Sequence, residues 1–168
     1  FVASFAPSER AKAAGGPVEV DIAGLAPGDI KTVEWRGKPV WVMRRTPQML
    51  AALQGHDTQL VDPQSKVAQQ PPYATNELRS IRDDVFVAVG ICTHLGCSPT
   101  AKLQAGVDSG LGENWKGGFY CPCHGSKFSR SGAYVAGPAP RGMDRYPTSV
   151  NADDGLLYID TGAREEGP

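Results

Sequence analysis

The segments Cys92-Thr93-His94-Leu95-Gly96-Cys97 and Cys121-Pro122-Cys123-His124-Gly125-Ser126 contain all four cysteines and two of the three histidines of this 168-residue chain. Each segment pairs one Cys with one His in close register and carries a further Cys, at position 97 or 123. Cysteine and histidine gathered in two short segments are typical of a metal site. The pattern suggests a centre of two thiolates and two imidazoles beside a disulfide.

The type of ligand does not choose the metal, because thiolate and imidazole suit zinc, copper and iron-sulfur centres. A zinc finger of the two-Cys, two-His kind places both Cys in one pair and both His in the other, whereas each pair here has one of each. An all-cysteine zinc ribbon or a plant-type ferredoxin would leave the histidines without a role. The mixed set favours a [2Fe-2S] cluster with two thiolates on one iron and two imidazoles on the other. The alternatives are a zinc site or two independent disulfides, and neither accounts for the mixed spacing.

The two segments, here called box 1 (92–97) and box 2 (121–126), resemble the cluster-binding boxes of Rieske iron-sulfur proteins. The likeness is closest to the high-potential branch found in the quinol:cytochrome c oxidoreductases, the bacterial cytochrome bc complexes. Rieske ferredoxins and ring-hydroxylating oxygenases generally lack the extra Cys in each box. The resemblance covers about residues 18–160. It is also seen in the proline loop that covers the cluster in this family, which matches Gly137, Pro138, Ala139 and Pro140.

The resemblance implies a role for each box residue. Two ligands would bind one iron through sulfur and two would bind the other iron through Nδ1, leaving Nε2 toward solvent. The two remaining cysteines would form a disulfide that joins the boxes. The implied ligands are Cys92, Cys121, His94 and His124, and the implied disulfide is Cys97 to Cys123.

Ser126 and Phe128, which follow the ligand His124 in the sequence, are expected to influence the reduction potential of the cluster. Ser126 matches the family serine whose hydroxyl donates a hydrogen bond to a bridging sulfide. Two positions further, high-potential members usually carry a Tyr that bonds a ligand cysteine sulfur, whereas this chain has Phe128. Donors to cluster sulfurs stabilise the more negative reduced state and raise the reduction potential. We therefore expect a potential below that of tyrosine-containing relatives, within roughly −150 to +300 mV.

The implied function is electron transfer from quinol to a c-type cytochrome. His124 would accept a proton from a bound quinol while the cluster accepts an electron, and Leu95 and the proline loop 137–140 would face the partner. The partners would be a cytochrome b-type subunit, a c-type cytochrome and quinol, and the chain would not turn over quinol alone. The alternative is the Rieske subunit of an arsenite oxidase-type periplasmic oxidoreductase, a group that usually departs from the Gly125-Ser126 pair.

Composition sets further bounds. The formal net charge of −1, without a basic stripe, argues against a nucleic-acid partner. The 20 Gly and 14 Pro indicate many turns, as in an all-β protein. The longest apolar run, Val85 to Cys92, is too short to span a bilayer. A disulfide implies an oxidising space such as the periplasm. The resemblance implies the periplasmic side of the bacterial inner membrane, with an N-terminal membrane helix that is absent from this sequence.

Strands are expected at Val18 to Ile22, in a hairpin around Arg36-Gly37-Lys38, at Val85 to Ile91, at Phe119-Tyr120 and at Leu156 to Asp160. A short helix with Thr46 as its N-cap is expected over Gln48 to Gln54, and Ser98 to Gly118 reads as a loop. The predicted organisation is a Rieske-type antiparallel base domain with an inserted cluster-binding subdomain. The ranges are 1–17 for a hinge, 18–89 and 141–160 for the base, 90–140 for the subdomain and 161–168 for a loose tail.

Overall fold

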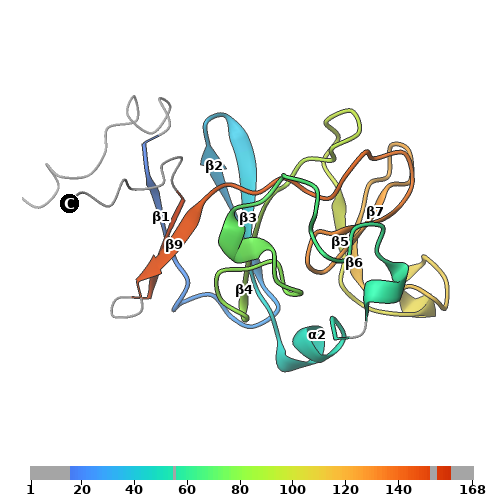
Figure 1. The fold of residues 1–168 in the computed structure, drawn as a ribbon. Helices are drawn as coiled ribbons and strands as arrows, with labels where there is room; N and C mark the ends of the chain where they lie inside the picture. The colour runs from blue at the N-terminus through green and yellow to red at the C-terminus, as the bar shows by residue number, and fades with distance from the viewer. Residues whose placement is uncertain (1–15, 55, 152–154, 160–168) are drawn as a thin grey trace, which may run out of the picture.

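The computed structural model describes residues 16–54, 56–151 and 155–159. These residues form antiparallel strands in three sheets, with one α-helix and a few short 3-10 turns (Figure 1). The all-β class predicted from the sequence is confirmed. The predicted hinge (apart from Gly16 and Pro17) and the tail lie outside the described residues. Within the described part of the chain, no helix is long and apolar enough to cross a membrane.

Two three-stranded sheets form the base of the molecule. One pairs strands from the two ends of the described chain in the order β1-β10-β9, and the other has the order β2-β3-β4. Apolar side chains from both sheets pack into one core, in which Val20, Trp35, Val42 and Leu157 are almost fully buried. The strands are β1 (Val18–Asp21), β2 (Ile30–Trp35), β3 (Lys38–Arg44), β4 (Val85–Val89), β9 (Thr148–Asn151) and β10 (Leu156–Ile159).

The predicted hairpin is present and tighter than expected. Lys38 belongs to β3, where it pairs with Trp35, so the turn consists of Arg36 and Gly37 alone. Both turn residues have positive φ, 50° and 72°, the backbone geometry that matches the right-handed twist of a two-residue hairpin. The hairpin places Val40 and Val42 of β3 opposite the fully buried strand β4.

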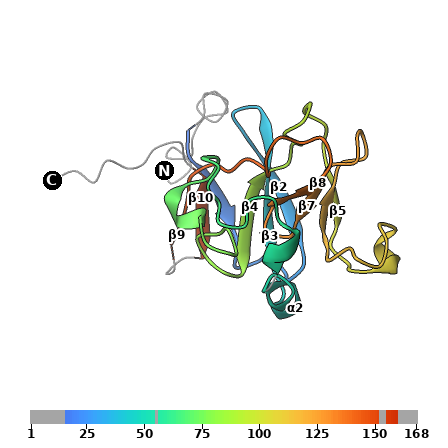
Figure 2. The same ribbon diagram turned by 45° about the vertical axis from the view of Figure 1, so that its right-hand side comes forward.

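A four-stranded sheet with the order β5-β6-β7-β8 lies at the far end of the molecule from β1, β9 and β10 (Figures 1 and 2). The loop predicted over Ser98 to Gly118 is corrected here, because it contains β5 and the 3-10 turn η4 (Val107–Ser109). Three-residue β5 has no clear alternation, and its pairing with β6 across 15 intervening residues is a tertiary event. The strands are β5 (Thr100–Lys102), β6 (Gly118–Tyr120), β7 (Lys127–Ser129) and β8 (Tyr134–Ala136). All four lie inside the range 90–140, whose boundaries stay a prediction.

The helix α2 (Pro47–Ala51) begins as predicted, with the Thr46 side chain accepting a hydrogen bond from the Met49 N–H at 3.2 Å. It ends earlier than the predicted Gln54. The Gln- and Pro-rich segment that follows contains two 3-10 turns, η2 (His56–Gln59) and η3 (Pro72–Ala74). The side chain of His56, the histidine outside the boxes, is not among the described ones.

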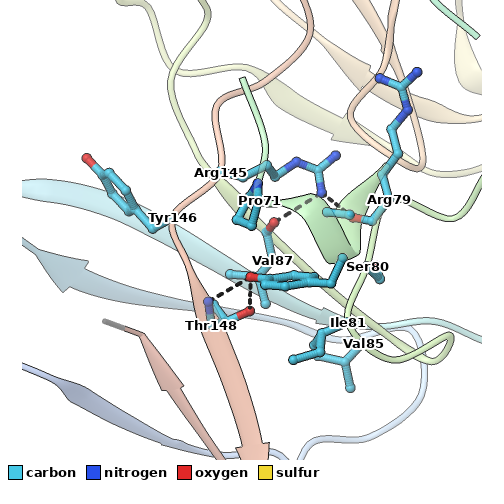
Figure 3. A pocket seen from close by; sticks show the side chains of 11 residues that line it. Pro71, Arg79, Ser80, Ile81, Val85, Val87, Arg145, Tyr146 and Thr148 are labelled. Atoms are coloured by element: carbon cyan, nitrogen blue, oxygen red, sulfur yellow. Dashed lines mark hydrogen bonds between the residues drawn. The ribbon is translucent and has the colours of Figure 1, made fainter. Parts of the chain in front are cut away.

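A buried guanidinium joins the base to the four-stranded sheet. Arg145 donates to the carbonyl oxygens of Arg79 at 2.6 Å and Val87 at 3.3 Å, as Figure 3 shows, and also to the carbonyl of Ser131 between β7 and β8. The same guanidinium lies 4.7 Å from the ring centre of Phe86, which in turn stacks on Phe119 of β6. Burial, with the like charges of Arg45 and Arg79, lowers the pKa of Arg145 to about 9. The segment after the proline loop is therefore bonded to both halves of the molecule.

Candidate metal centre

The two boxes are loops with the same backbone hydrogen bonds. In box 1, the N–H of Cys92 donates to the carbonyl of Cys97 at 2.7 Å, and the N–H of Gly96 donates to the carbonyl of Cys92 at 3.1 Å. In box 2 the equivalent bonds run from Cys121 to Ser126 at 2.8 Å and from Gly125 to Cys121 at 2.9 Å. The glycines have φ of 86° and 80°, a conformation that costs an L-residue free energy. Both loops are thus held at their ends by strands of the core, β4 before box 1 and β6 and β7 around box 2.

Each loop buries one free thiol. Cys92 is 2% exposed and Cys121 is 1% exposed, and the two thiols are in hydrogen-bonding contact. Burial is the main cause that raises the pKa of Cys92, and the backbone N–H of His94 opposes the rise. Two neutral thiols form only a weak hydrogen bond with each other. A metal ion displaces their protons and binds both sulfurs as thiolates.

Each loop also contributes one imidazole. The rings of His94 and His124 lie 4.8 Å apart between centres and meet edge to face at 89°. Nδ1 of His94 is buried and has no hydrogen-bond partner among the described residues. A buried nitrogen without a partner is unfavourable unless something binds it. It is the atom that the sequence predicted as an iron ligand, so the donor set of two thiols and two imidazoles fits the predicted cluster.

The predicted disulfide between Cys97 and Cys123 is present, with 6.6 Å between the Cα atoms. It ties box 1 to box 2 across 26 residues of sequence. The sulfur atoms of Cys97, Cys121 and Cys123 lie within 4.8 Å of one another, which is a possible metal-binding group by distance alone. Two of these sulfurs are bonded to each other, so this trio is not a set of three free thiols.

The proline loop packs directly on box 2. Gly137 has φ of 102°, and a Cβ at this position would lie 2.6 Å from Cα of Ser126. The Ser126 hydroxyl is fully buried, accepts a hydrogen bond from the N–H of Ala139 at 3.1 Å, and bonds the thiol of Cys92. Phe128 is fully buried and pairs with Phe119 across β6 and β7.

One residue of the predicted partner-facing set is corrected. Gly137, Pro138 and Pro140 are exposed, but Ala139 is only 4% exposed and packs into the core. The N–H of Ala139 donates to the Ser126 hydroxyl, and the Ala139 side chain lies in the core. Leu95 at the tip of box 1 is 71% exposed, and His124 is exposed as well.

Sequence reasoning missed Thr93. Its hydroxyl donates to the carbonyl of Arg141 at 2.8 Å and so fastens box 1 to the end of the proline loop. Arg141 itself is held by two hydrogen bonds to the carboxylate of Asp144. A threonine inside a ligand motif carries no signal of its own, because its partner is a backbone carbonyl 48 residues away.

Comparison with known proteins gives one family. The model of the Rieske [2Fe-2S] domain matches residues 18–147. The chain is 57% identical over 160 residues to the ubiquinol-cytochrome c reductase iron-sulfur subunit of Allochromatium vinosum, which covers 95% of this chain and 76% of that protein. The subunit of the same name from Bradyrhizobium diazoefficiens is 35% identical over 154 residues, covering 91% and 77%.

A solved structure agrees in fold. A chain of a hyperthermophilic respiratory Complex III is 25% identical and superposes with a TM-score of 0.50, covering 90% of this chain and 79% of that one. Its likeness spans the base sheets as well as the boxes, since nearly the whole described chain is matched. The chain therefore belongs to the Rieske [2Fe-2S] domain family and carries a [2Fe-2S] cluster.

Proposed function

We propose that this chain is the electron-transfer subunit of a quinol:cytochrome c oxidoreductase. The observation that carries the proposal is the arrangement of the boxes: two buried thiols in contact, two adjacent imidazoles, and a disulfide that ties the loops together. The relatives named ubiquinol-cytochrome c reductase iron-sulfur subunit support it. Box 2 keeps Gly125 and Ser126, which disfavours the arsenite oxidase alternative.

In this proposal Cys92 and Cys121 hold one iron and His94 and His124 hold the other. The buried thiols lie beneath the more accessible imidazoles, so the histidine side of the centre is the one nearest solvent. His124 is the more exposed of the two histidines, which makes its Nε2 the better atom to meet a substrate. The Ser126 hydroxyl lies beside Cys92 and would donate a hydrogen bond to a sulfur atom of the cluster.

When bound, the cluster supplies a one-electron acceptor. His124, bound to iron through Nδ1, would keep its exposed Nε2 available for a quinol hydroxyl. Nε2 would accept a hydrogen bond from the quinol hydroxyl and take its proton while the cluster takes the electron. Leu95 and the exposed residues of the proline loop pack against the protein that holds the quinol.

The partners in this proposal are a cytochrome b-type subunit, which would provide the quinol pocket, and a c-type cytochrome, which would take the electron. The subunit would lie on the periplasmic side of the bacterial inner membrane, where a disulfide persists. The isolated chain would not oxidise quinol, because the pocket belongs to the partner.

The test is the midpoint potential of the cluster-loaded chain as a function of pH. We expect a flat potential at low pH and a fall at alkaline pH, by about 59 mV per pH unit for each proton coupled to one electron. A potential that does not change from neutral to strongly alkaline pH contradicts the coupling. Leu95→Ala is the control: it should keep the potential and its pH dependence, yet slow quinol oxidation when the chain is assembled in its complex.

A further inference from the structure

The metal centre places a reduced thiol against an oxidised pair. The sulfur of Cys121 lies within 4.8 Å of both sulfurs of the Cys97–Cys123 disulfide, too close for another side chain to lie between them. Cys92, the other free thiol, is not part of this group. Cys121 is therefore the thiol that faces the disulfide.

A thiolate that meets a disulfide exchanges with it by attack on one sulfur. Attack by Cys121 on Cys97 forms a bond between these two sulfurs and breaks the bond from Cys97 to Cys123. Cys123 leaves as a thiolate and takes up the proton that Cys121 lost, so one disulfide and two thiols are present before and after. No oxidant is needed. Cys123 is exposed, so its departing thiolate is stabilised by water.

We propose that loss of the cluster commits this chain to a disulfide exchange in which Cys121 replaces Cys123 as the partner of Cys97. The inference rests on the proposed role of Cys121 as an iron ligand, because a sulfur bound to iron is not free to attack. The product has lost one ligand to a new disulfide and cannot take back a cluster until that bond is opened, by a reductant or by the return attack of Cys123. The disulfide that braces the centre is thus also the group that can take a cluster ligand once the iron is gone.

The experiment maps disulfides before and after iron removal. The cluster-loaded chain is treated with an iron chelator under anaerobic conditions, so that no oxidant can join Cys92 to Cys121. The reaction is stopped with acid, free thiols are alkylated under denaturing conditions, and unreduced peptides are fragmented between Cys121 and Cys123 in the mass spectrometer, because both cysteines lie in one peptide. The number of free thiols is two in either case, so only the map distinguishes the two pairings.

We expect the Cys97–Cys123 peptide before treatment, and its loss with the appearance of a Cys97–Cys121 peptide and alkylated Cys123 afterwards. Reconstitution with iron and sulfide should then fail, and a prior treatment with dithiothreitol should restore it. An unchanged Cys97–Cys123 peptide with alkylated Cys121 overturns the inference. Failure of the proposed ligand role of Cys121 looks different, because Cys121 would then be alkylated in the cluster-loaded protein before any iron is removed.

Two variants serve as controls. Cys121→Ser removes the attacking thiol and should keep the original disulfide under every condition. Cys92→Ser lacks a proposed ligand but keeps Cys121, so it should show the exchanged disulfide without any chelator. An original disulfide with a free Cys121 in that variant also counts against the inference.

Discussion

Box 1 and box 2 share one backbone design but differ in the side chains it carries. The same pair of hydrogen bonds closes each loop, and a glycine with positive φ occupies the fifth position in both. The histidine stands at the third position in box 1 and at the fourth in box 2. Where box 2 has exposed His124, box 1 therefore has exposed Leu95, and where box 1 has Cys97, box 2 has Ser126. A repeated loop thus gives a centre with one apolar tip and one titratable tip.

The largest effect is expected from cutting the link between the loops. Replacing both Cys97 and Cys123 by Ala should lower the free energy of unfolding by about 3 to 4 kcal/mol, because the 26-residue separation no longer restricts the unfolded chain. Denaturant unfolding of the unchanged protein and of the double variant, both loaded with the cluster, measures the difference. Amide hydrogen exchange should become faster in the two boxes, while Val42 in the base core keeps its protection. An equal loss of protection in both regions would show that the boxes and the base unfold as one unit.

The next effect concerns the loop that covers box 2 but not box 1. Gly137→Ala should destabilise the chain by about 2 to 3 kcal/mol, because its Cβ would collide with backbone atoms of Ser126 and Gly125 in addition to the cost of positive φ. The matched control is Gly96→Ala, which has positive φ but nothing within 4 Å, and should cost about 1 to 2 kcal/mol. Thermal unfolding of both variants distinguishes collision from backbone strain, and equal losses would contradict the close packing of the proline loop.

A smaller effect is expected on the potential. Phe128→Tyr would add a hydroxyl to a buried ring of β7, next to box 2, and should raise the midpoint potential by about 40 mV, the equivalent of about 1 kcal/mol for one electron. The physical cause is donation to a ligand sulfur, which stabilises the reduced state. Voltammetry measures the shift, and an unchanged or lower potential refutes the explanation. Phe119→Tyr, on the neighbouring strand β6 of the same sheet, tests whether a hydroxyl added at another buried ring has the same effect on the potential.

The smallest effect lies in the base, away from both loops. A hydrogen bond from Arg82 holds the pKa of Asp84 below its usual value, so the folded state favours the ionised carboxylate. The resulting stability is present above the unfolded pKa of about 4 and is lost as pH falls through the lower folded pKa. Both side chains are about one third exposed, so Asp84→Asn should cost less than about 1 kcal/mol at neutral pH. The difference from the unchanged protein should disappear at low pH, and the cluster potential should not move.

The parts of the site that could be predicted are those whose side chains carry chemistry of their own. Cys92, His94 and the disulfide cysteines have few other uses in such spacing, so the motif indicates them directly. Ala139 could not be placed, because its orientation depends on an N–H that bonds Ser126. The roles of Thr93 and Arg145 could not be predicted either, because their partners are backbone carbonyls that become neighbours only in the folded chain.

The fold shows the same division. The hairpin around Arg36-Gly37 has local turn chemistry and was predicted within one residue, as was the start of the helix at Thr46. Strand β5 was missed because its three residues gain their structure from β6. Local signals thus gave the hairpin and the helix start, whereas strands that depend on distant partners required the folded structure.

The Arg145 guanidinium has a mechanical consequence. Its bonds reach the carbonyls of Arg79 and Val87 in the base and of Ser131 in the far sheet, and none of these bonds can lengthen without leaving a buried cation partly unsolvated. Shear between the two halves is therefore resisted at their junction. A displacement of the sheet that contains Val87 would therefore carry the cysteine loops with it as one body.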